Sequence, residues 1–280
     1  SLSSISYNYM TIQTAQCSSL NIPIPIKQKQ NIWKENDIIL YQYKICPFCN
    51  RAKAYMDYNN IPYTKIEVNP LTKNEISFYK NKPKKVPIAI MKDEVVPNSN
   101  SIVYRLQQDL ANININININ DDNDKNININ DENGQVIDNV KSVISEDTQK
   151  WMDWSEKLAV LLYPNITKTF NESWEAFEYT SHVQSWSFMS RWSNRILGPI
   201  AMLFANGKIK AKYNIWDEKK DLKNCLIVWT DSLEGKYLHG ENVTTPDLMV
   251  YGVLHSIEGL QTFPDIMIEI IQLPKLPKYL

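Results

Sequence analysis

The feature that most constrains the fold is a strand-like run that leads directly into a pair of cysteines. Residues 38–43 (IILYQY) are almost all β-branched, apolar or aromatic, which is typical of a buried strand. Cys46-Pro47-Phe48-Cys49 follows at once, and Ala52, Tyr55 and Met56 then keep helical spacing up to the break at Pro62. The sequence therefore places a CxxC pair where a strand ends and a helix begins.

Further patterns extend this unit into a small α/β domain. After the first strand and helix, we expect strands at 63–68, 86–90 and 94–96, and helices at 71–79 and 99–110. The resulting order βαβαββα over residues 36–110 predicts a thioredoxin-like domain of the glutaredoxin type.

Three other parts of the chain have different patterns. Residues 1–35 lack periodicity and are expected to be a tail or leader. Residues 111–145 contain an Asn-Ile repeat, whose alternation alone would predict a strand; we favour an unpacked low-complexity insert and linker, because the domain has already ended there. A turn at 131–135 suggests a short hairpin after the repeat. Residues 146–280 are predicted to be all-helical.

Two helices of this last part have clear signals. Apolar residues at helical spacing from Trp151 to Leu162 predict a helix that ends at Pro164. The start of the second is marked by Thr244 to Asp247, a capping-box-like segment with proline in the first turn. Its expected buried stripe is Val250, Tyr251, Leu254, Ile257 and Leu260. We interpret the tryptophans and tyrosines of this half as core residues.

Composition excludes several classes of function. The net charge of −1 gives no reason to expect nucleic acid as a partner, and none of the seven glycines falls in a nucleotide-binding motif. No apolar stretch approaches the ~20 residues of a membrane span. The four cysteines, Cys17, Cys46, Cys49 and Cys225, do not form a secreted disulfide framework, so we expect a reducing, cytoplasmic location.

The CxxC pair is the candidate catalytic centre. Amides at a helix start stabilise negative charge, so the pKa of Cys46 is expected to fall below the ~8.5 of a free thiol, with Lys44 adding to this. Cys49 lies about one turn further and is expected to be the more buried, resolving partner. A zinc site would need two more well-spaced ligands, which the sequence does not offer, so we expect no metal.

Two other segments are expected to complete a glutathione site. A cis peptide bond at Val86-Pro87 would present the backbone of Val86 to a bound peptide or glutathione. The amides at Asn98-Ser99, together with the Ser99 hydroxyl, would hold the γ-glutamyl carboxylate at the start of a helix. Alternatively, Ser99 is simply the N-cap of that helix.

The run Leu40–Cys49 (LYQYKICPFC) resembles the signature of the membrane-associated type 2 prostaglandin E synthases. The resemblance extends over residues 37–263, interrupted by the Asn-Ile repeat. Further matching segments are Ile61–Tyr63, Glu67–Pro70, Lys85–Ile88, Lys150–Trp154, Tyr163–Asn165, Val250–Leu254 and Glu258–Leu260.

The resemblance implies a glutaredoxin-like domain followed by an all-α glutathione-transferase-like domain, usually as a homodimer. It implies conversion of the endoperoxide prostaglandin H2 to prostaglandin E2 with glutathione, and the family can also bind haem. It further implies association with an endomembrane such as the Golgi through a segment outside this chain.

The family's site residues carry over position by position. The nucleophile falls on Cys46 and the hydrogen-bonding tyrosine on Tyr43. The glutathione contacts are Phe48, Cys49, Val86, Pro87, Asn98 and Ser99. Asn98 stands where the family has aspartate, which weakens the expected ion pair with the glutathione amine. Two alternatives stay open: a glutathione-dependent thiol–disulfide oxidoreductase or transferase, and a non-enzymatic protein that binds glutathione or haem.

Overall fold

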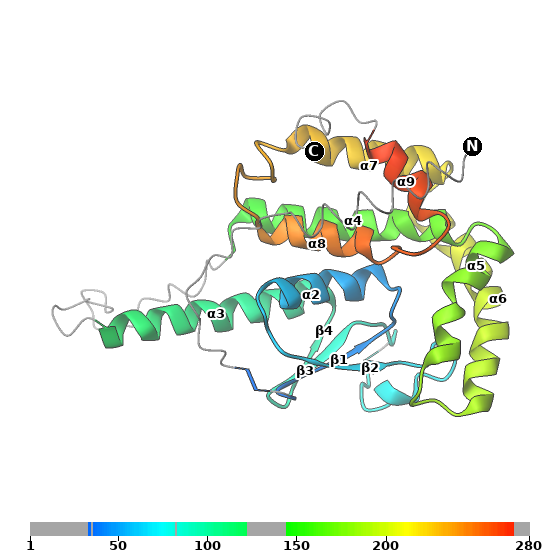
Figure 1. Ribbon diagram of the computed structural model, residues 1–280, viewed down its shortest axis with the longest axis horizontal. Coiled ribbons are helices and arrows are strands. Elements are labelled where there is room, and N and C mark those ends of the chain that lie inside the picture. Colours follow the sequence, from blue (N-terminus) through cyan, green and yellow to red (C-terminus); the bar gives the residue numbers. More distant parts are fainter. Residues whose placement is uncertain (1–32, 35, 82, 122–143, 272–280) are drawn as a thin grey trace, which may run out of the picture. The chain divides into compact units, whose positions relative to one another are not determined.

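In the computed structural model, the described residues are 33–34, 36–81, 83–121 and 144–271. The predicted tail lies outside them except for Trp33 and Lys34, and so do the second half of the Asn-Ile repeat and the predicted hairpin. Figure 1 shows a small sheet next to a set of stacked helices. Among the described residues, no helix is both long and apolar enough to cross a membrane.

The first part has the predicted thioredoxin-like order. Its elements are β1 (Ile38–Gln42), α2 (Pro47–Tyr58), β2 (Thr64–Glu67), the 3-10 turn η1 (Asn74–Ile76), β3 (Ile88–Met91), β4 (Glu94–Pro97) and α3 (Ser99–Asp121). The sheet order is β2-β1-β3-β4. β1 pairs in parallel with β2 and antiparallel with β3, so that the chain leaves a central strand to enter the thiol loop.

The second part is helical, as predicted. Its elements are α4 (Glu146–Ile166), α5 (Phe170–Ala176), the 3-10 helix η3 (Glu178–His182), α6 (Phe188–Tyr213), α7 (Glu218–Ser232), α8 (Thr245–His255) and α9 (Phe263–Ile271). Ser145 caps α4, and Thr244 and Asp247 form the predicted capping box of α8.

The two parts share a packed boundary along α2. Figure 1 shows α2 between the sheet and α8, and α8 contacts both α2 and α4. A Cβ at Gly252 of α8 would lie 2.4 Å from the backbone oxygen of Asn50 in α2. This close approach excludes any side chain at position 252 and brings the helical part against the helix that carries the cysteines.

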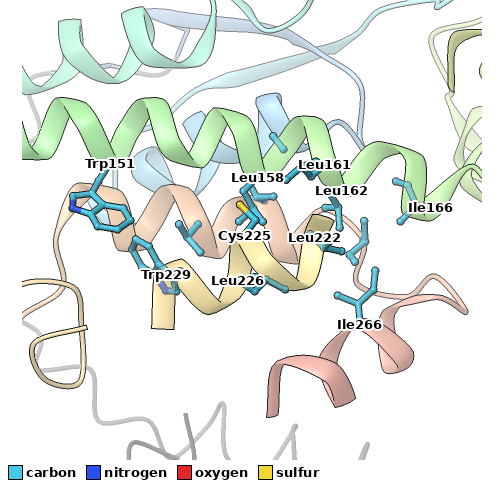
Figure 2. Packing of buried hydrophobic residues seen from close by; sticks show 14 of the residues in the cluster. Trp151, Leu158, Leu161, Leu162, Ile166, Leu222, Cys225, Leu226, Trp229 and Ile266 are labelled. Carbon is cyan, nitrogen blue, oxygen red and sulfur yellow. The ribbon is translucent and has the colours of Figure 1, made fainter. Parts of the chain in front are cut away.

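The core of the helical part is built from α4, α7, α8 and α9. Figure 2 shows Leu158, Leu162 and Leu226 packed together, with the rings of Trp151 and Trp229 in edge contact at 5.5 Å. The prediction that the tryptophans belong to the core is thus correct for these two. It is wrong for Trp192 and Trp216, which are 51% and 89% exposed.

Two predicted helices differ from the structure in their extent. Only η1 lies within the helix predicted at 71–79: the Asn69 side chain accepts the amides of Leu71 and Thr72, and Lys73 adopts a positive φ of 54°. The helix predicted at 99–110 instead continues to Asp121, so the strand interpretation of residues 112–121 is wrong. Extending a helix that has already nucleated costs little per residue.

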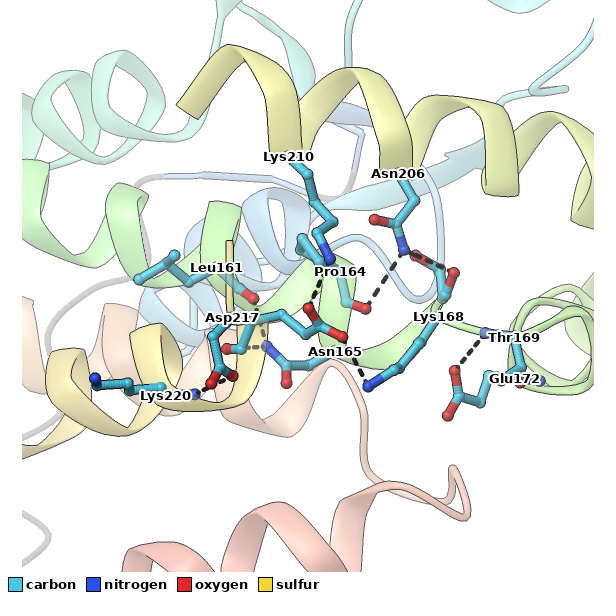
Figure 3. Close-up of polar contacts among 12 residues, drawn as sticks. Leu161, Pro164, Asn165, Lys168, Thr169, Glu172, Asn206, Lys210, Asp217 and Lys220 are labelled. Atoms are coloured by element: carbon cyan, nitrogen blue, oxygen red, sulfur yellow. Dashed lines mark hydrogen bonds and ion pairs between the residues drawn. The ribbon is translucent and has the colours of Figure 1, made fainter. Parts of the chain in front are cut away.

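The predicted end of α4 at Pro164 is also wrong, because the helix continues to Ile166. At this end of the helix, two side-chain amides donate hydrogen bonds to backbone carbonyl oxygens. Asn165 donates to the oxygen of Leu161 at 2.9 Å, and Asn206 of α6 donates to the oxygen of Thr167 at 2.7 Å. Figure 3 shows these amides beside Pro164.

The predicted buried stripe of α8 fails at Tyr251, which is 57% exposed. Since Gly252 faces α2 and Val253 faces the core, the side chain at 251 points away from both, and its ring stacks on His255 at 5.2 Å. The helix ends at His255, so the buried Ile257 lies beyond it.

Candidate active site

Cys46 lies at the start of α2, as predicted. It is the N-cap residue, in an extended conformation, and Pro47 occupies the first turn. The backbone amide of Cys46 donates to the carbonyl oxygen of Tyr43 at 3.0 Å, which closes the turn between β1 and the helix. This local geometry points the first amides of α2 toward the Cys46 sulfur.

The two cysteines are free thiols with opposite environments. Cys46 is partly exposed, whereas Cys49 is fully buried. The pKa of Cys46 is lowered, first by a hydrogen bond from the Cys49 thiol and then by the backbone amides of Cys49 and Phe48. Burial raises the pKa of Cys49, and the charge of Cys46 adds to this. The pair therefore favours a thiolate on Cys46 beside a protonated Cys49.

Lys53 is the cation that further lowers the pKa of Cys46. It lies two turns along α2 from Cys46, so helical spacing alone could have identified it. Burial lowers the pKa of Lys53 itself. Lys44, the cation expected from the sequence, has an exposed side chain and contributes its backbone amide to Glu67 instead.

Three tyrosines lie within electrostatic range of the Cys46 sulfur. Burial raises the pKa of Tyr43, and the charge of Cys46 raises it further. The same two causes raise the pKa of Tyr163 of α4, and both act on Tyr179 of η3 together with Glu67. All three hydroxyls therefore stay protonated and can donate hydrogen bonds. The sequence predicts Tyr163 and Tyr179 to be core residues, because no spacing pattern relates either of them to the thiol loop.

Glu67 is a further residue near the thiols that the sequence analysis did not assign to the site. Its carboxylate accepts hydrogen bonds from the backbone amide of Lys44 at 2.7 Å and from Nε2 of Gln42 at 3.1 Å. Tyr179 also hydrogen-bonds to it, and burial raises its pKa to about 6. Since Lys44 lies in the thiol loop, Glu67 fixes that loop to β2 and to η3.

The peptide bond between Val86 and Pro87 is cis, as predicted. Val86 packs in the same buried cluster as Cys49, with Cys46 and Tyr43 against it. Among the hydrogen bonds of the described residues, none uses the backbone N–H or C=O of Val86. The structure thus brings Val86 to the thiols, and its main-chain groups can bind a peptide-like ligand.

Phe48 is held differently from the other predicted contacts. Although it lies between the two cysteines in sequence, its ring packs against the core of the helical part. Its backbone amide, not its ring, acts on Cys46 by lowering the thiol pKa.

Asn98 and Ser99 begin α3, but their side chains have unexpected partners. Asn98 has a positive φ of 56°, and its side chain accepts the amide of Ser101 at 2.8 Å. Asn98 is therefore the N-cap, and the interpretation of Ser99 as the cap is wrong. The Ser99 hydroxyl is buried and accepts a hydrogen bond from Nη1 of Arg51 at 2.7 Å, which ties the start of α3 to α2.

Arg51 joins the thiol helix to its surroundings. Its guanidinium is fully buried and donates to Ser99, to the carbonyl oxygen of Met152 at 2.6 Å, and to Oγ of Ser155 at 2.9 Å. Because these partners lie on α3 and α4, one side chain of α2 fixes both neighbours. Burial lowers its pKa to about 10.

Within the described residues, no group of three or more histidine, cysteine or acidic side chains is placed to hold a metal ion. Two of the three histidines lie against carboxylates: Nε2 of His239 is 2.8 Å from Asp147, and Nδ1 of His255 is 2.6 Å from Glu258. In the described part of the chain, nothing independently marks a ligand for the haem iron that the resemblance implies.

Comparison with known proteins agrees with this geometry. Residues 40–112 match the family described as "Glutathione S-transferase, N-terminal domain". The thioredoxin-like part has the fold of a glutathione-transferase N-terminal domain. With the helical part, it gives the fold class predicted from the sequence.

The chain is also similar to proteins named prostaglandin E synthase 2. Identity is 27% with the Danio rerio protein and 25% with the Mus musculus protein, in each case over 82% of this chain. The aligned part spans 67% and 66% of those two proteins, about two thirds of their length. The predicted resemblance is therefore confirmed.

Among solved structures, glutaredoxin 2 of Salmonella typhimurium in complex with glutathione is 17% identical. The match covers 88% of this chain and 99% of that one, with a TM-score of 0.37.

Proposed function

We propose that the protein is a glutathione-dependent enzyme that isomerises the endoperoxide prostaglandin H2 to prostaglandin E2. The observation that carries the proposal is the partly exposed Cys46, whose pKa is lowered at the start of α2 and which packs with Tyr43 and Val86. The resemblance to the proteins named prostaglandin E synthase 2 supports the choice of substrate.

Glutathione would bind along the same cluster. The main-chain groups of Val86 would pair with its peptide backbone, and the amide of Ser99 would meet its γ-glutamyl carboxylate. Asn98 carries no charge for the glutathione amine, and its side chain already caps α3. Bound glutathione supplies a third thiol beside those of Cys46 and Cys49.

The isomerisation needs one base and one hydrogen-bond donor. The Cys46 thiolate takes the proton from the ring carbon, and the C–H electron pair becomes the second bond of the new ketone. The O–O bond breaks in the same step, and its electron pair moves to the other oxygen. Tyr43, held protonated by its raised pKa, hydrogen-bonds to that oxygen, which becomes a hydroxyl by taking the proton held on Cys46, so that the thiolate is restored. No electron leaves the substrate.

The hydrogen bond between the two thiols favours a second candidate, a thiol–disulfide oxidoreductase. In that reaction the Cys46 thiolate attacks a disulfide and expels one thiol. The Cys49 thiol then loses its proton and attacks Cys46, forming the internal disulfide and releasing the second thiol. Two glutathione molecules reduce this disulfide and become glutathione disulfide.

Two assays on one preparation separate these functions. Wild type, Cys46→Ser and Cys49→Ser are compared in endoperoxide conversion and in reduction of a glutathione mixed disulfide. The proposal expects isomerisation to be lost in Cys46→Ser and largely kept in Cys49→Ser. Isomerisation that survives Cys46→Ser would refute it. Turnover in the disulfide assay alone would favour the oxidoreductase, and glutathione binding without turnover in either assay would indicate a non-enzymatic binding protein.

A further inference from the structure

A cavity lies among the helices α5 and α6 and the 3-10 helix η3. Its volume is about 260 Å³, and its walls are Trp174, Ser181, Phe188, Arg191, Trp192 and Arg195. None of these residues belongs to the thiol site. Figure 1 shows that α5 and α6 lie side by side, which places residues distant in sequence around one hollow.

The walls of this cavity are mainly aromatic. The rings of Phe188 and Trp192, one turn apart on α6, lie 6.0 Å from each other, and both side chains are more than half exposed. Exposed rings of this size are costly in water unless a ligand or partner covers them. The cavity therefore favours a ligand with an apolar body.

The polar groups of the cavity are two guanidinium groups. Arg191 and Arg195 are four residues apart on α6, so they lie on one face of the helix. Arg195 is fixed in place, because its guanidinium stacks on the ring of Trp174 at 4.0 Å and donates to the carbonyl oxygen of Trp174.

Arg191 has an unused donor. Its Nε is buried and has no hydrogen-bond partner in the part of the chain that the structure describes. Buried donors are nearly always paired in folded proteins, so this donor is free to bind a water, an ion or a ligand in the cavity. Glu178 is the acid whose charge reaches Arg195, which leaves the two arginines with a net positive charge.

We propose that this cavity binds a carboxylate with an unbranched apolar chain, such as a medium-chain fatty acid. The planar fork of an arginine matches the two oxygens of a carboxylate, and the aromatic walls cover the chain. Because the thiol residues are not involved, this site is separate from the proposed reaction and goes beyond it.

Calorimetric titration of the full chain with decanoate tests the proposal. We expect saturable binding that is at least tenfold weaker for decan-1-ol, which lacks the charge. Each methylene removed from the chain should weaken binding by up to about fourfold. Absence of saturable binding, or equal binding of the acid and the alcohol, would overturn the proposal.

Variants locate the site. Arg191→Gln should weaken decanoate binding at least about tenfold, while Lys208→Gln, an exposed charge removed from the same helix, should leave it unchanged. Circular dichroism confirms that both variants fold. Cys46→Ser should bind decanoate like wild type, whatever its activity. Unchanged binding in Arg191→Gln, or loss of binding in Cys46→Ser, would contradict a separate site.

Discussion

The thiol site and helix α7 can be compared through one cysteine and one acidic residue of each, Cys46 and Glu67 against Cys225 and Glu218, whose pKa values shift in opposite directions. At the thiol site the pKa of Cys46 is lowered and that of Glu67 is raised to about 6. In the helical part the pKa of Cys225 is raised to about 11 and that of Glu218 is lowered to about 2. The residue types are the same, so their surroundings determine where negative charge is stable.

The physical causes can be identified in each region. Cys225 is buried in the middle of α7, whereas Cys46 has the amides at the start of α2. Glu218 accepts hydrogen bonds from Lys210 at 2.7 Å and from Lys168 at 2.9 Å. At Glu67, burial raises the pKa more than the hydrogen bonds from Lys44, Gln42 and Tyr179 lower it. A carboxyl with a raised pKa near the thiol is less often ionised and repels the thiolate less.

The largest expected effect comes from removing each thiol in turn. Cys46→Ser should lower glutathione-dependent turnover by about a hundredfold to ten-thousandfold, because the reacting base is lost. Cys225→Ala should leave turnover within about twofold of wild type, since its thiol is buried and protonated. Steady-state kinetics on both variants check this. Equal losses of turnover in the two variants would show that the two cysteines do not differ in function.

Arg51 connects the two regions, and its removal should affect stability most. Arg51→Met removes the buried guanidinium that donates to the Met152 oxygen and to Oγ of Ser155, which should lower the free energy of unfolding by about 3 kcal/mol. Arg105→Met is the matched control, because the ion pairs of Arg105 with Glu94 and Asp109 are partly exposed and contribute at most about 1 kcal/mol. Urea unfolding measures both. A smaller loss of unfolding free energy in Arg51→Met than in Arg105→Met would contradict the role of Arg51 in joining α2 to α3 and α4.

The two carboxyls should give opposite pH dependences of stability. The folded-state pKa of Glu67 is raised, so its ionisation costs stability as the pH rises from about 4.5 past 6, by up to about 2 kcal/mol. The folded-state pKa of Glu218 is lowered, so its contribution is present above about 4.5 and is lost as the pH falls toward 2.

Urea midpoints measured across this pH range test these signs. Glu67→Gln should flatten the profile between about pH 4.5 and 6, and Glu218→Gln should flatten it between about pH 2 and 4.5. The reverse assignment, or two profiles identical to wild type, would show that the carboxyls do not carry these shifts.

The smallest expected effect concerns the cation near the thiol. Lys53→Gln should raise the pKa of Cys46 by less than about one pH unit, because hydrogen bonds are the larger cause. Lys44→Gln removes a charge from the exposed loop and should change this pKa less. The pH dependence of alkylation of Cys46 measures both variants. A larger change in Lys44→Gln would mean that the wrong cation has been assigned.

The sequence predicted those features of the site that depend on local pattern. Residues 38–43 and the CxxC pair define a strand, a turn and a helix start, so the places of Cys46 and Cys49 followed directly. The cis bond at Val86-Pro87 was predicted in the same way from its context.

The features that the sequence missed depend on contacts between distant segments. Tyr163 and Tyr179 reach the thiols only because the helical part packs onto α2. The Ser99 hydroxyl accepts a hydrogen bond from Arg51, which is 48 positions away in the chain. The helix predicted at 71–79 does not form over that range. The amides of Leu71 and Thr72, at its expected start, donate to the side chain of Asn69 instead.

The central claim is that Cys46 is an acidic thiol and Cys225 is not. Alkylation with iodoacetamide across a pH series, followed by peptide mass spectrometry, reads both cysteines in one wild-type sample. The account predicts that Cys46 reacts with an apparent pKa below the ~8.5 of a free cysteine, while Cys225 stays unmodified until the protein unfolds. An apparent pKa of Cys46 at or above that value would contradict it.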